Sequence, residues 1–365
     1  MHDIEFEDVT KEFDNGVVAL DHLTLTVRAR EMFGLVGPSG CGKTTAVRVL
    51  AGLEDATAGR VRIGGTDVGG VETRSRDLGL VTQGSQLLSH RTARRNISFP
   101  LDLRRRDPQE EIDERVVMEA AGLGIEHLLD RSPRTLSEGE RRRVQLARAV
   151  IRAPATLLMD EPLAALDDQI RVRMRTDVIR LQRLRGITSI LVTSRQEDAM
   201  AMCDRIAVLF DGVLHQVGTP SEVYHRPATS RVASFFGEPA MNIVEAVVER
   251  DAVGPRVRVL GSDLRLWGSD FPEYEGRPVL VGVRAEDLEI GKPSDRSVEA
   301  AVVSTEPMGH QTVAVVRDPQ GHRINCVLAG PPPPAGTVLD VGVRADRMHV
   351  FDPHTEMAIS HPSSV

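Results

Sequence analysis

The sequence predicts an α/β domain with a mainly parallel sheet, followed by a smaller all-β domain. Over the first part of the chain, short apolar runs alternate with helical stretches, which is typical of parallel strands covered by helices. After Phe236-Gly237 the pattern changes to many short alternating segments separated by turns. A length of 365 residues leaves room for two or three domains. We therefore expect domains at residues 1–236 and 237–365.

The elements of the α/β domain follow from apolar spacing and from helix stop signals. Met32 to Val36 is a short apolar run that suits a buried strand. Gly122 and Gly186 each end a helical pattern, and Pro108 suits the first position of a helix. Strands are expected near residues 23–27, 32–36, 61–63, 78–81, 157–159, 190–192 and 206–209. Helices are expected at 43–53, 108–121, 137–152, 168–185 and 196–202.

The second domain reads as a small barrel of short strands. From Val244 onward valines alternate with polar residues, and turns such as Pro319-Gln320-Gly321 separate the strands. Pro331 to Pro334 form a stiff stretch, which we interpret as a rigid loop rather than as a ligand for another domain. No helical pattern remains in this region. The sequence therefore predicts an all-β, barrel-like fold.

Composition excludes several classes of protein. The chain is 41% hydrophobic and 27% charged, as in ordinary globular proteins. A net charge of −8 and 3% aromatic residues argue against a nucleic-acid-binding surface. No apolar run approaches the ~18–20 residues of a membrane span, and the amino-terminal residues lack a hydrophobic signal core. Three cysteines favour a reducing compartment, so we expect a cytoplasmic location.

A phosphate-binding loop is the strongest motif. The sequence fits G-x-x-x-x-G-K-[ST], after an apolar strand and before a helix. Its glycines let backbone N–H groups close around a phosphate, and the helix N-terminus adds partial positive charge. The lysine, one of only three in the chain, would bind the β- and γ-phosphates, and the threonine hydroxyl would bind Mg²⁺. The expected nucleotide-binding residues are Gly37, Pro38, Ser39, Gly40, Cys41, Gly42, Lys43, Thr44 and, next in the helix, Thr45.

A second motif supplies carboxylates. Residues 156–159 form an apolar strand that ends in Asp160, followed by Glu161. In phosphate-loop folds an Asp at this place holds Mg²⁺. A carboxylate one residue further on can polarise the attacking water. The two motifs together predict a Mg²⁺-dependent ATP site and a phosphate-loop NTPase fold.

Further segments, in this order along nearly the whole chain, resemble the ATP-binding subunits of ABC transporters. The resemblance is closest to the maltose-type importer family, which serves sugars, glycerol phosphate and similar solutes. Its motifs are Val81-Thr82-Gln83 before Asn96 to Leu101, Leu136-Ser137-Glu138-Gly139-Glu140, Leu166-Asp167, and in the tail Gln216 to Pro220 and Gly282 to Glu286. The resemblance implies an ABC-type ATPase domain with a helical subdomain at about 84–152, followed by a regulatory, OB-like β-domain.

The resemblance also implies a mechanism. Two chains, identical or related, pair head-to-tail around two ATPs. Lys43, Thr44 and Asp160 of one chain and Ser137 and Gly139 of the other hold each nucleotide. Gln83 senses the γ-phosphate and Mg²⁺, Phe13 packs against adenine, and Asp167 lies in the D-loop.

The partners that this family implies are two membrane-spanning permease subunits and an extracytoplasmic solute-binding protein. The chain would then lie at the cytoplasmic face of the plasma membrane, held there through the permeases. No nucleic acid is expected among its partners.

The sequence departs from the family pattern in three places. The switch histidine of the family falls on Ser194, which is shorter and carries no charge, and Arg195 is a candidate substitute. The segment Leu136 to Glu140 corresponds to the signature motif of ABC proteins, and in it Glu138 and Glu140 replace glycine and glutamine. Glu140 has capping-box spacing from Ser137, so it either starts a helix or repels the incoming γ-phosphate. Thr82 replaces an aromatic residue, and Arg91, Arg94 and Arg95 form a solvated face.

These departures predict that ATP hydrolysis is slow. Because Lys43, Asp160 and Glu161 are all present, we still expect the chain to be a real ATPase. The alternative is a nucleotide-binding, weakly hydrolysing subunit that regulates or depends on a partner. Two further classes remain open: a soluble ABC protein that acts on ribosomes or DNA, and a regulatory module in which the β-domain is primary. In the family that the chain resembles, the solute-binding protein and the membrane subunits select the transported solute.

Overall fold

The computed structural model describes residues 2–82, 86–104, 107–164, 166–259, 262–266, 272–291, 297–309 and 311–362. The chain divides into two compact units, Met1–Pro220 and Ser221–Val365. Residues 221–236, which the sequence analysis assigned to the first domain, form two short helices that pack within the second unit. The boundary at 236/237 stays a prediction.

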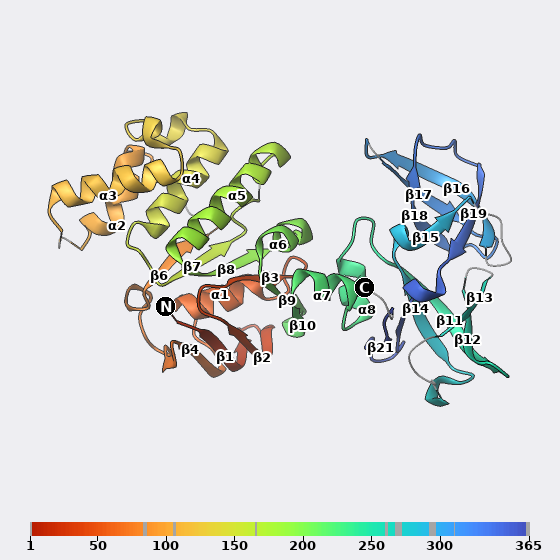
Figure 1. Cartoon of the computed structure of the whole chain (residues 1–365). Helices are drawn as coiled ribbons and strands as arrows, with labels where there is room; N and C mark the ends of the chain where they lie inside the picture. The colour runs from red at the N-terminus through yellow and green to blue at the C-terminus, as the bar shows by residue number, and fades with distance from the viewer. Residues whose placement is uncertain are drawn as a thin grey trace. The chain divides into compact units, whose positions relative to one another are not determined.

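The first unit is built on two sheets (Figure 1). The smaller sheet has the order β2-β1-β4-β5, and the larger one has the order β10-β9-β3-β8-β7-β6. The larger sheet is parallel except for its edge pair β9 and β10, as the sequence predicts. The strands are β1 (Ile4–Glu12), β2 (Val18–Val27), β3 (Met32–Val36), β4 (Ala58–Ile63), β5 (Thr66–Asp67), β6 (Leu78–Val81), β7 (Thr156–Asp160), β8 (Thr188–Thr193), β9 (Arg205–Phe210) and β10 (Val213–Gly218).

Within the described residues of this unit, six α-helices accompany these strands. They are α1 (Lys43–Ala51), α2 (Ala93–Asp102), α3 (Gln109–Gly122), α4 (Glu138–Val150), α5 (Asp168–Arg185) and α6 (Gln196–Met202). α2, α3 and α4 pack on one another and form the helical group seen in Figure 1. The predicted helix at 168–185 has the expected ends, with Asp167 as its N-cap and Gly186 in a left-handed conformation at its C-terminus.

Several predicted helix boundaries differ from the structure by one or two residues. α1 ends at Ala51 rather than 53, because Gly52 has φ +71° and its N–H bonds back to the carbonyls of Arg48 and Val49. α4 ends at Val150 rather than 152. Pro108 is the residue before α3 rather than its first residue.

The core of the first unit places the phosphate loop. Every residue of β3 is buried, and β3 lies between β8 and β9 as parallel neighbours. Phe6 of β1, Val47 of α1 and Phe33 of β3 belong to one hydrophobic cluster. α1 therefore packs between the small sheet and the large sheet, which holds its N-terminus at the carboxyl end of β3.

The described residues of the second unit form strands apart from two short α-helices and 3₁₀ turns, in agreement with the prediction. Its two sheets have the orders β13-β12-β11-β14-β20-β21 and β15-β19-β16-β17-β18, and both contribute to one valine-rich core. The elements are α7 (Pro220–His225), α8 (Ser230–Phe235), β11 (Asn242–Asp251), β12 (Gly254–Val259), β13 (Ser262–Arg265), β14 (Pro278–Val283), β15 (Leu288–Ile290), β16 (Ser297–Pro307), β17 (Gln311–Arg317), β18 (Arg323–Ala329), β19 (Val338–Val343), β20 (His349–Phe351) and β21 (Ala358–Ser360).

A buried arginine joins α7 and α8 to this β-domain. Arg284, 3% exposed, donates to the carbonyl oxygens of Tyr224 and Phe236, and its guanidinium lies 3.8 Å from the centre of the Tyr224 ring. Burial lowers the pKa of this guanidinium. Among the described residues, no helix is long and apolar enough to cross a membrane.

Candidate functional site

The phosphate loop packs closely against the neighbouring main chain. Gly37 has φ +155°, and a Cβ there would lie 2.1 Å from the carbonyl oxygen of Leu209. Gly42 has φ +101°, and a Cβ there would lie 2.2 Å from the carbonyl oxygen of Ala19. Both positions therefore require glycine for conformation and for space. The loop tip at residues 38–40 is exposed, and no side chain caps the N-terminus of α1.

Lys43 is folded back into this loop. Its Nζ donates to the carbonyl oxygens of Gly37 and Pro38 at 2.8 Å each, and the side chain is only 5% exposed. The Sγ of Cys41 lies 3.7 Å from the same Nζ. Burial raises the pKa of the Cys41 thiol, although the nearby ammonium acts in the opposite direction. The loop thus holds a buried cation at the start of α1.

Thr44 and Asp160 meet across the sheet. The Thr44 hydroxyl donates to Oδ1 of Asp160 at 3.1 Å, joining the start of α1 to the end of β7. Asp160 is 6% exposed, and burial raises its pKa, against the effect of the Thr44 hydrogen bond. A hydroxyl and a carboxylate at this spacing are the hard oxygen ligands that Mg²⁺ takes together with phosphate oxygens.

Glu161 is fixed to the end of β8. It has a left-handed backbone with φ +49°, and its N–H donates to the carbonyl oxygen of Val192 at 2.9 Å. Its Oε1 accepts the main-chain N–H of Ser194 at 2.8 Å. These contacts place the Glu161 carboxylate beside Ser194, at the same sheet edge as Asp160. A main-chain contact of this kind leaves no sequence signal, so the sequence analysis missed it.

The candidate substitute for the histidine at position 194 is engaged elsewhere. Nε of Arg195 lies 3.4 Å from a carboxylate oxygen of Glu197, and the Arg195 side chain is exposed. Ser194 is half-buried, and in the described residues its hydrogen bonding is through the main chain. The part of Arg195 in the chemistry stays a prediction.

The signature forms a capping box at the start of α4. Ser137 is the N-cap, its N–H and Oγ donate to Oε2 of Glu140 at 2.8 and 2.9 Å, and the N–H of Glu140 donates to Oγ of Ser137 at 3.4 Å. Glu140 therefore folds back onto the Ser137 N–H and caps the start of α4, and its effect on an incoming γ-phosphate stays a prediction. The hydrogen bond from the Ser137 N–H lowers the pKa of Glu140. The carboxylate of Glu138 instead pairs with Arg141 at 2.7 Å.

Gly139 and Asp167 lie where α4 meets the start of α5. A Cβ on Gly139 would come within 2.8 Å of the Ile170 side chain, so a larger residue would push the two helices apart. The Asp167 carboxylate accepts the N–H of Ile170 at 3.0 Å as a helix cap. Among the described residues, the N–H and hydroxyl of Ser137 contact Glu140, its carbonyl oxygen accepts the N–H of Arg141 at 2.9 Å, and none of its hydrogen bonds is with the phosphate loop.

The remaining predicted residues are dispersed. Phe13 is half-buried in the turn between β1 and β2, with the Lys11 ammonium 5.0 Å from its ring centre. Thr45 is half-buried on α1. Gln83 lies outside the described residues. Of the expected solvated arginines, Arg91 lies over the Phe99 ring, Arg94 pairs with Asp130, and Arg95 is exposed.

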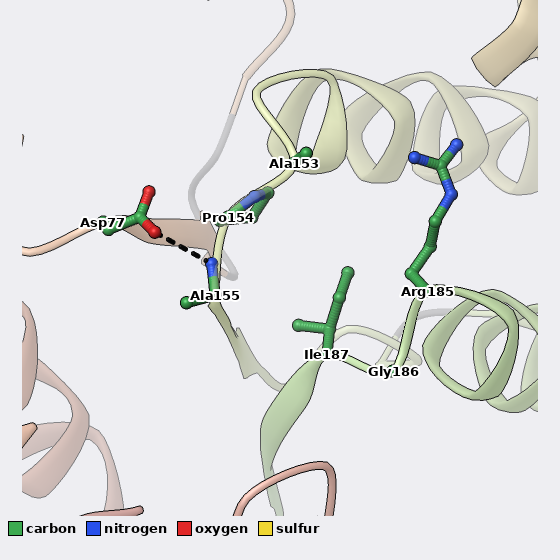
Figure 2. A pocket seen from close by; sticks show the side chains of 7 residues that line it. All are labelled: Asp77, Ala153, Pro154, Ala155, Arg185, Gly186 and Ile187. Carbon is green, nitrogen blue, oxygen red and sulfur yellow. Dashed lines mark hydrogen bonds between the residues drawn. The ribbon is translucent and has the colours of Figure 1, made fainter. Parts of the chain in front are cut away.

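A pocket of about 260 Å³ lies away from these residues (Figure 2). Its lining includes Asp77, Ala155 and Ile187, which directly precede β6, β7 and β8. The phosphate loop and Asp160 instead lie at the carboxyl ends of β3 and β7. Because these strands are parallel, the pocket occupies the opposite sheet edge, and none of the predicted site residues lines it.

Comparison with known proteins agrees with this geometry. The family model described as ABC transporter matches residues 20–164, the MalK OB fold domain matches 237–288, and the TOBE domain matches 281–351. The trehalose/maltose import ATP-binding protein MalK of Thermococcus litoralis is 40% identical, covering 98% of this chain and all of its own length. The sn-glycerol-3-phosphate import ATP-binding protein UgpC of Cereibacter sphaeroides is 39% identical, covering 97% and 99% of the two chains.

Solved structures resemble the first unit. The dimeric ATP-binding cassette MJ0796 bound to ADP and Pi is 28% identical, with a TM-score of 0.55, over 60% of this chain and 98% of its own. CbiO1 of Clostridium perfringens is 27% identical, with a TM-score of 0.57, over 60% and 89%. The fold and site thus define an ABC-type ATPase. The chain belongs to the ATP-binding subunits of ABC transporters that carry a MalK-type OB and TOBE region after the ATPase domain.

Proposed function

We propose that this chain binds and hydrolyses ATP to energise a membrane importer for a sugar or a related solute such as glycerol phosphate. The observation that carries the proposal is the meeting of Thr44 and Asp160 at 3.1 Å, with Glu161 next in the chain and the buried Lys43 beside Thr44. Relatives of matching length are named as trehalose/maltose and sn-glycerol-3-phosphate import proteins, which supports the solute class.

The phosphate loop fits a triphosphate. The Lys43 ammonium already donates hydrogen bonds to two loop carbonyls. It can exchange these bonds for bonds to β- and γ-phosphate oxygens with little movement. Thr44 and Asp160 would hold Mg²⁺, together with Gln83, and the ion would neutralise charge between the phosphates. Phe13 would pack against adenine.

Hydrolysis would depend on the Glu161 carboxylate. Its place at the end of β8 suits it to orient a water molecule against the γ-phosphate. Ser194 can add a hydrogen bond through its hydroxyl but no charge. We therefore expect slow hydrolysis.

The complete site would form between two chains, head-to-tail. Ser137 and Gly139 of one chain would close on the γ-phosphate that the other chain holds, with Asp167 at the same interface. A dimeric structure among the similar cassettes supports this arrangement. A lone chain should accordingly hydrolyse ATP poorly.

The other components would be two permease subunits and an extracytoplasmic solute-binding protein. The names of the import relatives support permease partners, and the chain would lie on the cytoplasmic face of the membrane through them. The second unit would regulate or dimerise the assembly.

The test is the ATPase rate of the assembled transporter. The proposal expects a rate clearly above that of the Glu161→Gln variant, which keeps a hydrogen-bond acceptor beside Ser194 but cannot act as a base. Equal rates would support the alternative, a nucleotide-binding subunit that scarcely hydrolyses ATP. Ser194 in place of histidine is the observation that favours this alternative.

A further inference from the structure

Glu140 holds both polar hydrogen-bond donors of Ser137. One carboxylate oxygen, Oε2, accepts the Ser137 N–H at 2.8 Å and the Ser137 hydroxyl at 2.9 Å. In the described part of the chain no ion pair of Glu140 is found, and the pKa of its carboxyl is lowered mainly by the Ser137 N–H, with a smaller effect from Arg131. Its negative charge is therefore directed at the donors that the proposed dimer would offer to the γ-phosphate of ATP.

The neighbouring carboxylate is arranged differently. Glu138 pairs with Arg141 through both Nε at 3.1 Å and Nη2 at 2.7 Å, and among the described residues it forms no hydrogen bond with Ser137. Its charge is thus compensated by a cation on the next turn of α4. The two acidic residues of the signature have different electrostatic roles, although they lie two positions apart.

We propose that Glu140 acts as an internal substitute for the γ-phosphate at Ser137, so that ATP-driven closure must first displace its carboxylate. The inference rests on the proposed function, in which Ser137 faces the nucleotide of the partner chain. Ser137 is exposed in the single chain, so water screens the contact there. At a closed interface both the carboxylate and the triphosphate would lose that screening, and their repulsion would grow.

The substitution Glu140→Gln isolates this effect. A glutamine carbonyl oxygen can still accept the Ser137 N–H, so the capping box and α4 are retained. The negative charge is lost, and the new amide N–H₂ can donate to a phosphate oxygen. Glu138→Gln is the matched control, because it removes one negative charge from the same turn without changing the contacts of Ser137.

The measurement is ATP occlusion by the full-length chain in a Glu161→Gln background, which slows turnover. Radiolabelled ATP retained after rapid gel filtration is plotted against ATP concentration for chains with Glu140, Glu140→Gln and Glu138→Gln. We expect Glu140→Gln to lower the ATP concentration for half-maximal occlusion by about fivefold or more, the effect of removing one charged hydrogen bond. Glu138→Gln should shift it less than twofold, and thermal melting should show all three chains folded.

Each other outcome has a distinct meaning. Occlusion that is unchanged by Glu140→Gln would overturn the inference while leaving the head-to-tail dimer intact. Equal gains from both substitutions would also overturn it, because general charge would then explain the effect. If no chain retains ATP, and Ser137→Ala changes nothing in the ATPase of the assembled transporter, the proposed function of the signature fails together with the inference.

Discussion

The carboxylate of Glu161 is held by a main-chain N–H rather than by a side chain. The donor is the amide of Ser194, which any residue except proline would supply. The identity of the side chain at 194 can therefore change without releasing Glu161. The contribution of position 194 to catalysis therefore depends on the hydrogen bond or charge that its own side chain adds.

We expect Ser194→Ala to change kcat less than threefold and Ser194→His to raise it. One added hydrogen bond made in the transition state, at about 1.4 kcal/mol, corresponds to roughly a tenfold gain. The measurement is the steady-state ATPase of the assembled transporter. A histidine variant that is no faster than the wild type would show that position 194 has no switch role. Arg195 would then be the remaining candidate for that role.

At the scale of elements, α1 carries both phosphate-binding side chains and depends on a cap at its other end. Arg76, 7% exposed, donates to the carbonyl oxygens of Val49 and Leu50 at 2.8 Å and to that of Val71. These bonds satisfy the last carbonyls of the helix with a cation, where the helix dipole is negative. Arg76 thus supports the site from the far end of α1.

Replacing Arg76 by methionine should lower the free energy of unfolding by about 2–3 kcal/mol, because buried carbonyls lose their donors. Arg74→Met is the matched control. Its side chain is 82% exposed and pairs with the exposed Glu72, so the loss should stay below about 0.5 kcal/mol. Chemical denaturation of both variants would check this, and equal losses would contradict the capping role.

Motifs with fixed spacing could be predicted, and contacts between distant main-chain atoms could not. The phosphate loop, Asp160 and Glu161 follow from local patterns, because each pattern specifies both an element and a side chain. The Ser194 amide, the Arg76 cap and the Ala19 carbonyl behind Gly42 depend on how strands far apart in sequence meet. The capping box could be proposed from spacing, but the arrangement of both Ser137 donors on one oxygen could not.

At the scale of the whole molecule, the second unit carries an acid-sensitive pair. Nδ1 of His349 lies 3.1 Å from Nδ1 of His361, so one ring must donate and the other accept. Burial, with His361, Arg284 and His225 nearby, lowers the pKa of His349 to about 3. In the folded state His349 therefore stays neutral at pH values where the same histidine in the unfolded chain, with its ordinary pKa near 6.5, binds a proton.

The free energy of unfolding of the second unit should accordingly fall as the pH drops from about 6.5 toward 3. His349 should contribute up to roughly 1.4 kcal/mol of this loss per pH unit. His349→Phe should flatten the dependence, while replacement of the exposed His354 by glutamine should leave it unchanged. The free energy of unfolding at each pH would be measured by urea denaturation followed by circular dichroism. An equally steep acid loss in His349→Phe would assign the effect to other groups.

The three buried cysteines give the molecule built-in probes of local opening. Cys41 and Cys203 lie in the first unit and Cys326 in the second, and burial raises the pKa of each thiol, that of Cys326 to about 12. Each can react with an alkylating reagent only during transient opening, so three reaction rates would report three local opening free energies. Bound ATP should slow Cys41 most, since the nucleotide would clamp the loop around it, and the rate at Cys326 would serve as an internal reference in the same chain.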